Sequence, residues 1–220
     1  YSMKSQISID GPAASGKTSI GRKVSSHLKF RFLDTGLMYR AATWIVIKNN
    51  INIDNEFEII SSVTNSNFSI NSNLKEDSLF IDNYNAISEL RTSEIDKYVS
   101  HVSKIVKVRE TLVNQQRSIA ASGNIVMVGR DIGSVVLPNA DIKIYLDASL
   151  EIRAKRRFEE VKGSTKLSFK EIKQDLEKRD IIDSNRKISP LTIPEDATVV
   201  NTDNLTISQV IEKIISIVEI

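Results

Sequence analysis

The stretch IDGPAASGKTSIGRK, residues 9–23, indicates how the rest of the chain folds. It contains GPAASGKT, residues 11–18, which matches the pattern G-x-x-x-x-G-K-[ST]. The short β-branched run at residues 5–10 predicts a strand before it, and the apolar periodicity of residues 17–28 predicts a helix after it. Loop N–H groups and a helix N-terminus form a concave anion site. The stretch therefore predicts a loop that holds the phosphates of a nucleotide.

Individual side chains in this loop have expected roles. Lys17 is expected to reach the β- and γ-phosphates, and the Thr18 hydroxyl is expected to coordinate Mg²⁺. The residues expected to bind the nucleotide are Gly11, Pro12, Ala13, Ala14, Ser15, Gly16, Lys17, Thr18 and Ser19. The alternative is a helix that is merely capped after a Gly-Pro turn, which leaves no need for a lysine in a glycine-rich loop.

Composition restricts the class of protein. The 220 residues favour one domain with a sizeable core, and a net charge of +2 is too small to indicate a nucleic-acid partner. The chain has no cysteine, which excludes disulfides and thiolate chemistry and is compatible with a reducing cytosol. No apolar run approaches the roughly 20 residues that span a bilayer, and no signal peptide is visible. We therefore expect a cytoplasmic protein without a membrane partner.

Strand-like and helix-like segments alternate along the chain. Further strands are expected at residues 30–34, 124–128, 141–146 and 198–201. Further helices are expected at residues 38–47, 54–63, 94–121, 149–161 and 168–181 and from Thr206 onward, with Asp54 and Ser93 as caps. Such alternation predicts an α/β fold, with a five-stranded parallel sheet flanked by helices.

Two segments interrupt this alternation. Residues 67–87 are rich in Asn and Ser and contain two short alternating runs, at 68–70 and 79–81, with Asp82-Asn83 as a hairpin turn. They predict a small β-rich insert. Residues 162–165, Lys-Gly-Ser-Thr, predict a mobile loop.

The phosphate loop alone leaves several reactions open, because GTPases, motor ATPases and small-molecule kinases all carry it. A GTPase would need an N/T-K-x-D motif, which the sequence lacks. A motor would need an apolar strand that ends in Asp-Glu, whereas the strand here ends in Val128-Gly129-Arg130-Asp131.

Four further stretches distinguish among these classes. They are LDTGLMYRA (33–41), RTSEIDKYVSHVSKIVKVRE (91–110), VGRDIGSVVLPNADIKIYLDAS (128–149) and RDIIDSNRKISPL (179–191). Together with the phosphate loop they resemble the bacterial cytidylate kinases, which phosphorylate CMP and dCMP with ATP. The resemblance runs from Met3 to the end of the chain. It implies a single P-loop kinase domain at 3–220, with a monophosphate-binding insert at about 64–90 and a short lid at about 156–168.

The resemblance also implies how the acceptor is held. Arginine presents a planar fork of donors to phosphate oxygens. The residues that would surround the acceptor's phosphate are Arg40, Arg130 and Arg186, with Thr35 and Tyr39 lining the same pocket.

The base and the sugar have their own expected contacts. By resemblance, Asp131 would accept from the N4 amino group of cytosine and Arg109 would donate to its N3 and O2, with Ser100 beside them. Uracil would set an oxygen against the Asp131 carboxylate, so it should be rejected. Asp183 and Arg179 would contact the sugar.

A basic turn in the helix expected at 149–161 would close over the transferred phosphoryl group, by analogy with nucleoside monophosphate kinases. Its cations are Arg153, Arg156 and Arg157. The catalytic residues implied are Lys17, Arg130, Arg156 and Arg157. The cofactors implied are ATP and Mg²⁺.

Some features leave alternatives open. Val106 stands where the family commonly has proline, and Asn201 stands where it often has Asp. A kinase with another acceptor, such as UMP or a non-nucleotide, is the runner-up. An ATP-binding module that controls a partner is a different class, although it would not need the arginine set. A monomer is the default, because no heptad seam is evident.

Overall fold

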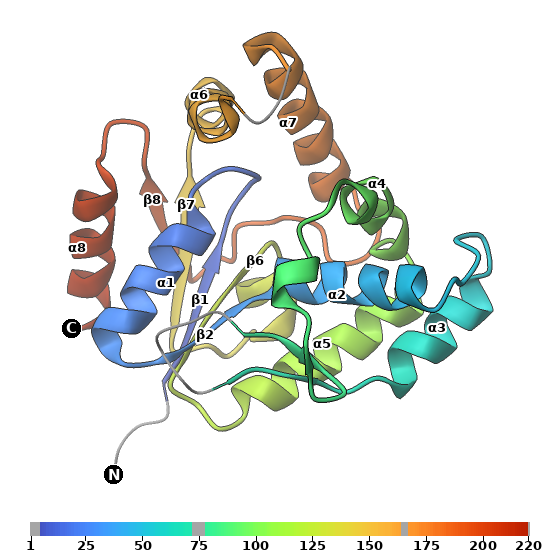
Figure 1. The fold of residues 1–220 in the computed structure, drawn as a ribbon. Helices are drawn as coiled ribbons and strands as arrows, with labels where there is room; N and C mark the ends of the chain where they lie inside the picture. Colours follow the sequence, from blue (N-terminus) through green and yellow to red (C-terminus); the bar gives the residue numbers. More distant parts are fainter. Residues whose placement is uncertain (1–4, 72–77, 164–166, 220) are drawn as a thin grey trace.

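The computed structural model describes residues 5–71, 78–163 and 167–219, which build a parallel sheet between two layers of helices (Figure 1). The sheet has five strands in the order β2-β6-β1-β7-β8. The strands are β1 (Gln6–Asp10), β2 (Arg31–Asp34), β6 (Ile125–Gly129), β7 (Ile142–Asp147) and β8 (Thr198–Asn201). All their pairings are parallel, so their carboxyl ends meet at one edge. The predicted fold class is confirmed.

Helices α1 and α8 cover one face of the sheet, α2, α3 and α5 lie on the other, and α6 and α7 project beyond the carboxyl edge (Figure 1). Their bounds are α1 (Lys17–Leu28), α2 (Thr35–Lys48), α3 (Glu56–Asn65), α4 (Ser93–Val102), α5 (Val106–Ala120), α6 (Leu150–Val161), α7 (Phe169–Ser184) and α8 (Ile207–Val218). A 3₁₀ turn, η1 (Ile87–Glu89), and a π-helical turn, η2 (Ile132–Val136), complete the set. No helix in the described ranges has the length and apolarity to cross a membrane.

Strand β6 shows why the sheet needs helices on both faces. All its residues are buried, and its side chains alternate between two apolar clusters. Ile125 and Met127 join the cluster that contains α2 and α5, while Val126 and Val128 join the cluster that contains α1 and α8. Full burial of such a side chain contributes roughly 1.5–3 kcal/mol.

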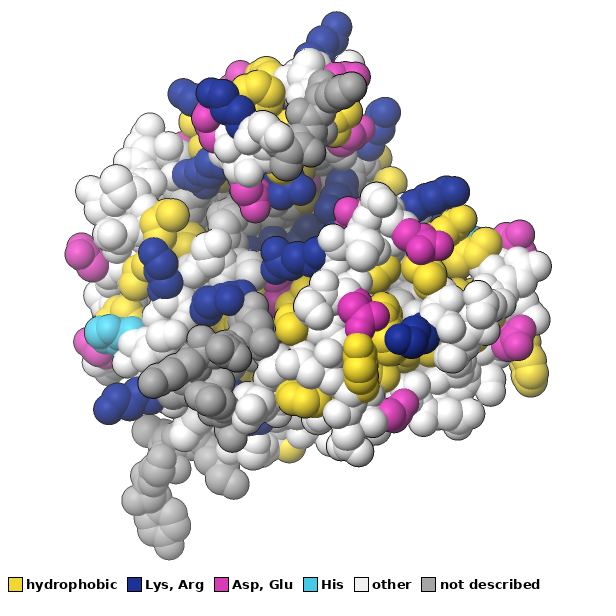
Figure 2. All heavy atoms as spheres, viewed as in Figure 1, with side chains coloured by type: hydrophobic (Ala, Val, Ile, Leu, Met, Phe, Trp, Pro, Cys, Tyr) yellow, Lys and Arg dark blue, Asp and Glu magenta, His cyan; other side chains and the backbone are white. Residues whose placement is uncertain are grey.

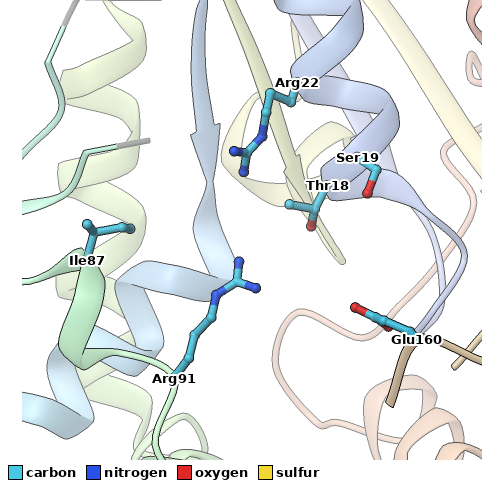
Figure 3. A pocket seen from close by; sticks show the side chains of 6 residues that line it. All are labelled: Thr18, Ser19, Arg22, Ile87, Arg91 and Glu160. Carbon is cyan, nitrogen blue, oxygen red and sulfur yellow. The ribbon is translucent and has the colours of Figure 1, made fainter. Parts of the chain in front are cut away.

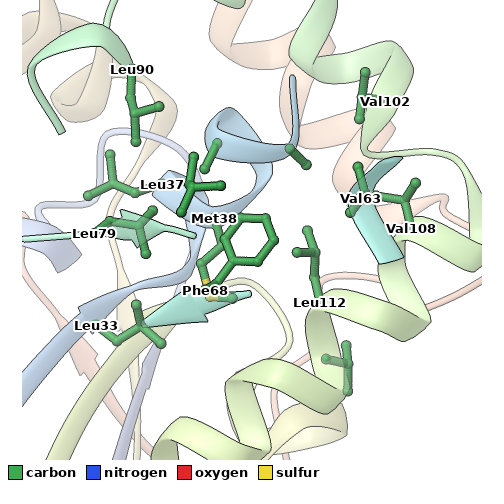
Figure 4. Packing of buried hydrophobic residues seen from close by; sticks show 14 of the residues in the cluster. Leu33, Leu37, Met38, Val63, Phe68, Leu79, Leu90, Val102, Val108 and Leu112 are labelled. Atoms are coloured by element: carbon green, nitrogen blue, oxygen red, sulfur yellow. The ribbon is translucent and has the colours of Figure 1, made fainter. Parts of the chain in front are cut away.

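A second, antiparallel sheet consists of β3 (Phe68–Ser69), β4 (Phe80–Ile81) and β5 (Tyr84–Asn85). Asp82 and Asn83 have φ of 49° and 70° between β4 and β5, which confirms the predicted hairpin turn. Phe68 of β3 and Met38 of α2 belong to the same cluster of buried apolar side chains (Figure 4). Residues 72–77, inside the predicted insert, and residues 164 and 165 of the predicted mobile loop lie outside the described residues.

The predicted single helix at 94–121 is wrong. The chain forms α4 and α5 with a break between them, where Ile105 is extended (φ −66°, ψ 115°) and 7% exposed. The break lets Ile105 enter the core, and the Ser103 carbonyl accepts from Arg109 at 3.4 Å. The predicted cap Ser93 is also wrong, because the Thr92 side chain accepts from the Ile95 amide. Periodic valines on both sides of the break concealed it from the sequence.

Two other helix starts differ from prediction. Helix α2 begins at Thr35, not at residue 38, because the Asp34 carboxylate accepts from the Gly36 amide at 2.9 Å. Helix α3 is capped by Asn55 rather than Asp54. The Thr206 cap of α8 is confirmed and includes a complete capping box.

The break between α4 and α5 makes Val106→Pro a stabilising change. Val106 is the first residue of α5 and is 44% exposed. Proline suits the first position of a helix, because the N–H group that it lacks would not bond to a carbonyl of the same helix. Ile105 already has the extended backbone that the residue before a proline requires. We expect the free energy of unfolding to rise by about 0.4–1 kcal/mol in urea titrations. Val106→Ala, which does not restrict φ, should lack this gain, and a lowered stability of Val106→Pro would contradict the expectation.

Candidate active site

The predicted phosphate loop lies between β1 and α1 at the carboxyl edge of the sheet (Figure 1). Glycine is required at two of its positions. A Cβ on Gly11 would lie 2.3 Å from the Leu146 carbonyl oxygen, and Gly16 has φ of 91° where α1 begins. The loop therefore packs tightly against β7 and turns its backbone into the helix N-terminus.

Lys17 crosses this loop and is buried. Its Nζ donates to the Pro12 carbonyl at 2.7 Å, and the residue is only 7% exposed. Burial lowers the pKa of Lys17 well below its usual range, and the positive charge of Arg130 lowers it further. The cation thus lies in a site that favours an incoming negative charge.

Thr18 and Asp34 form a pair of oxygen donors beside the loop. The Thr18 hydroxyl donates to Asp34 Oδ2 at 2.7 Å, while Asp34 Oδ1 receives the Gly36 amide. Hydroxyl and carboxylate oxygens are the ligands that Mg²⁺ prefers. In the described ranges no three His, Cys, Asp or Glu side chains gather as a metal cage, so a cation here would need further ligands from a substrate. Asp34 was not among the predicted site residues, although its place at the end of β2 was a signal.

A cluster of arginines surrounds the buried Asp183 on α7. Arg130 Nε donates to Asp183 Oδ2 at 2.8 Å, and Arg186 donates to the other carboxylate oxygen. Burial alone would raise the pKa of Asp183, but the two guanidinium groups outweigh burial and hold it below its usual range. Arg179, also on α7, joins this cluster: partial desolvation and the charge of Arg130 lower its pKa.

Arg40 of α2 belongs to the same positive region, because its charge also lowers the pKa of Arg179. Its guanidinium donates to the Leu90 carbonyl at 3.1 Å and to Asp96 at 2.6 Å. Figure 2 shows Lys and Arg side chains gathered in a hollow of the surface below α6 and α7. The fold thus brings Arg40, Arg130 and Arg186 to one region.

Arg109 and Asp131 form a buried ion pair in the same region. Arg109 Nη2 lies 2.8 Å from Asp131 Oδ2, and each residue is 4% exposed. The Tyr39 ring lies 5.0 Å from the Arg109 guanidinium carbon, and burial raises the pKa of Tyr39 to about 12. Thr35 is buried nearby, with its hydroxyl on the Val128 carbonyl.

This ion pair has unused hydrogen-bonding capacity. Arg109 Nε is buried and has no hydrogen-bond partner among the described residues, and the neighbouring Gln116 side chain faces Tyr39. Buried donors without partners are costly and mark a place where a polar ligand would fit. Gln116 was missed by the sequence analysis, since a glutamine in a helix carries no signal of its own.

Asp10, at the end of β1, holds the segment that carries Asp131. Its carboxylate accepts from the Ile132 and Gly133 amides at 2.8 and 2.7 Å. Burial raises the pKa of Asp10 to about 6, against the effect of these hydrogen bonds. Asp10 therefore ties η2 to the strand that precedes the phosphate loop.

Three predicted residues form no hydrogen bond or ion pair with these groups in the described part of the chain. Ser100 is exposed on α4. The Arg156 guanidinium binds the hydroxyl and carbonyl of Thr202 at 2.9 and 2.6 Å, in the loop before α8. Arg157 pairs with Glu160 at 2.8 Å. Their expected roles remain predictions, and those of Arg156 and Arg157 require these contacts to break.

Arg153, the third cation of that helical turn, is 5% exposed and joins three elements. Its guanidinium donates to the carbonyls of Ala148 and Ala13 at 2.9 and 3.1 Å and pairs with Asp180 of α7 at 2.6 Å. Arg153 thus attaches α6 and α7 to the phosphate loop and is not a mobile cation.

A cleft of about 490 Å³ opens beside the loop (Figure 3). Its lining residues are Thr18, Ser19, Arg22, Ile87, Arg91 and Glu160. They come from α1, from the segment around η1 and from α6. The cleft therefore connects the phosphate loop with the insert and with the end of α6.

Comparisons with known proteins agree with this geometry. The family model described as "Cytidylate kinase" matches residues 7–220. A "Cytidylate kinase" of Caldanaerobacter subterraneus subsp. tengcongensis is 44% identical over 210 residues, covering 95% of this chain and 92% of that protein. One of Alkaliphilus oremlandii is 44% identical over 215 residues, 97% of each. The shikimate kinase structure from Bacteroides thetaiotaomicron shares the fold, with a TM-score of 0.51, 12% identity and coverage of 98% and 99% of the two chains.

Proposed function

The chain belongs to the cytidylate kinase family and is an ATP-dependent CMP kinase, and we propose that the residues at the carboxyl edge of its sheet carry out this reaction with dCMP as a second acceptor. The observation that carries the proposal is the buried Arg109–Asp131 pair, which lies at the same edge of the sheet as the phosphate loop. A base-reading pair next to a phosphate loop suits a nucleotide acceptor.

The phosphate loop holds ATP in this proposal. Backbone N–H groups of residue 11 and residues 13–19 would donate to the β- and γ-phosphates, and Lys17 would exchange the Pro12 carbonyl for phosphate oxygens. The lowered pKa of Lys17 supports this role, because a nearby polyanion would restore its full charge.

Mg²⁺ would be held by the Thr18 hydroxyl and the Asp34 carboxylate, together with phosphate oxygens. Their hard oxygen donors fit this cation. When bound, the cation neutralises part of the negative charge on the phosphates.

The acceptor lies across the edge of the sheet from ATP. Arg40, Arg130 and Arg186 bind its phosphate, and Asp183 with Arg179 contacts the sugar. Asp131 accepts from the amino group of cytosine, and Arg109 donates to N3 and O2 with the Nε that lacks a partner. Thr35, Tyr39 and Ser100 complete the pocket.

Positioning and charge neutralisation account for the chemistry. An oxygen of the acceptor's phosphate attacks the γ-phosphorus in line, and the bond to the β-bridging oxygen breaks with its electron pair left on ADP. The attacking oxygen is already anionic near neutral pH, so no side chain need remove a proton. Lys17 and Arg130 offset the charge that two polyanions bring together.

We also propose the organisation that goes with this function. Residues 3–220 form a single kinase domain, with a monophosphate-binding insert at about 64–90 and a short lid at about 156–168. Arg156 and Arg157 then reach the phosphates only after the lid closes. The enzyme works as a cytoplasmic monomer.

An ADP-release assay with Mg·ATP and CMP, dCMP, UMP, AMP, GMP or no acceptor tests the proposal. We expect fast release with CMP and dCMP and slow release with the other acceptors, because only cytosine offers an amino group to Asp131. Fast release with UMP would contradict the role of Asp131. Release that does not depend on an acceptor would contradict the kinase and leave an ATP-hydrolysing module.

A further inference from the structure

Arg91 lies across the cleft from the phosphate loop. It follows η1 in the chain and lines the cleft together with Thr18 and Ser19 of α1. Figure 3 shows its guanidinium pointing into the cleft, toward the side from which Thr18 projects. Thr18 and Ser19 of the predicted phosphate site therefore face Arg91, to which neither the sequence nor the family resemblance gave a role.

The charges around the cleft favour a polyanion. Arg22 and Arg91 both line it, and Glu160 is the one acidic side chain among the lining residues. Glu160 is already paired with Arg157, which offsets its charge. Arg91 is exposed and has no hydrogen bond or ion pair with another described residue, so its donors are available to a ligand.

The backbone that carries Arg91 is held against α2. Glu89 accepts from Trp44 Nε1 at 2.9 Å and from the Tyr84 hydroxyl. Trp44 and Tyr84 stack with ring centroids 5.6 Å apart. The next residue, Leu90, gives its carbonyl to Arg40. These contacts attach the backbone of Arg91 to α2, the helix that also carries Arg40. The backbone position of Arg91 is therefore fixed relative to the acceptor site.

We propose that Arg91 is a further catalytic residue. It contacts the γ-phosphoryl group during its transfer, from the side of the cleft opposite the phosphate loop. This inference rests on the proposed function. While the γ-phosphorus leaves the β-bridging oxygen and bonds to the acceptor's phosphate oxygen, its equatorial oxygens carry charge that Arg91 stabilises. Arg156 and Arg157 cannot do so in the present arrangement, since Thr202 and Glu160 hold them.

Arg91→Ala and Arg91→Lys test this role. We expect Arg91→Ala to lower kcat by about 100-fold or more, with KM for ATP and for CMP changed by less than about threefold. Arg91→Lys should recover only part of kcat, because an ammonium lacks the planar fork, and added guanidinium ions should partly rescue Arg91→Ala. Melting temperatures should stay unchanged, since the side chain is exposed. Lys97→Ala, which removes an exposed cation from α4, is the matched control and should keep wild-type kcat.

Two results would overturn the role of Arg91. One is a kcat of Arg91→Ala within about twofold of wild type. The other is a rise in KM for CMP alone, which would make Arg91 a binding residue only. Wild-type protein without CMP-dependent ADP release would instead overturn the proposed function, so the two failures are distinguishable.

Discussion

Lys17→Ala is expected to lower kcat by about 1,000-fold or more while the Kd for CMP changes by less than about threefold. Nζ lies within the phosphate loop on the Pro12 carbonyl, where it would meet the phosphates of ATP but not the acceptor's base. Steady-state kinetics and CMP titration of the variant measure the two quantities. Normal turnover would contradict the assignment of Lys17.

The same variant should not lose stability. No carboxylate forms an ion pair with Lys17 in the described part of the chain, and its lowered pKa means that the folded state disfavours the charged form. Between that pKa and the ordinary lysine value the unfolded chain binds the extra proton, so Lys17 costs stability at neutral pH, and the cost falls as pH rises. Lys17→Ala should therefore keep or raise the melting temperature and weaken this pH dependence.

Lys143 provides a matched control for Lys17. It is also a buried lysine that donates to a proline carbonyl, that of Pro138 at 2.6 Å, but it pairs with Asp196 at 2.7 Å as well. Lys143→Ala should destabilise the protein by about 1–3 kcal/mol, since it leaves polar groups without their partner. The kcat of its folded fraction should remain near wild type. Comparison of the two variants then separates an effect on kcat, expected for Lys17→Ala, from an effect on the free energy of unfolding, expected for Lys143→Ala.

Asp131→Asn is expected to lower the ratio of kcat/KM for CMP over UMP by about 100-fold or more. In the proposed site the carboxylate would accept from the amino group of cytosine and repel O4 of uracil, whereas the asparagine amide could donate to O4. Asp131→Ala should also relax the preference, with less gain for UMP. An unchanged ratio in both variants would contradict the base-reading role.

Loss of the Asp131 charge should also destabilise the fold, because Arg109 would remain buried without its partner. Breaking a buried ion pair from one side costs about 3–5 kcal/mol. Urea titrations measure this cost. The CMP-to-UMP ratio is insensitive to it, since both acceptors use the same folded fraction, so the ratio isolates the change in recognition.

Local signals predicted much of the fold correctly. The helix expected at residues 17–28 has those bounds in the structure, because Gly16 supplies the left-handed turn and the apolar spacing continues for the whole helix. The turn at Asp82 and Asn83 and the cap at Thr206 depend on neighbouring residues only. The break before Val106 was missed, because burial of Ile105 outweighs a continuous helical pattern.

The sequence named candidate site residues, but it did not show which side chains they contact in the folded chain. The stretch at residues 128–131 marked Arg130 and Asp131 through its place after a buried strand, whereas nothing in it indicated that Asp183 would bind Arg130. Gln116 and Arg91 carried no signal that separated them from core or surface residues, whereas the place of Asp34 at the end of a strand was a signal. Their contacts exist only where distant elements meet.

Short stretches of the chain determine the succession of strands and helices, the phosphate loop and the family. They can do so because glycine conformation, capping and apolar periodicity depend on residues that are near neighbours in sequence. Which side chains contact each other is not determined by these local signals. Arg109 and Asp131 are 22 residues apart, Arg130 and Asp183 are 53 apart, and Arg156 and Thr202 are 46 apart. Packing of the helices around the sheet sets these encounters, since side-chain ion pairs and hydrogen bonds act over a few ångströms and not along the sequence.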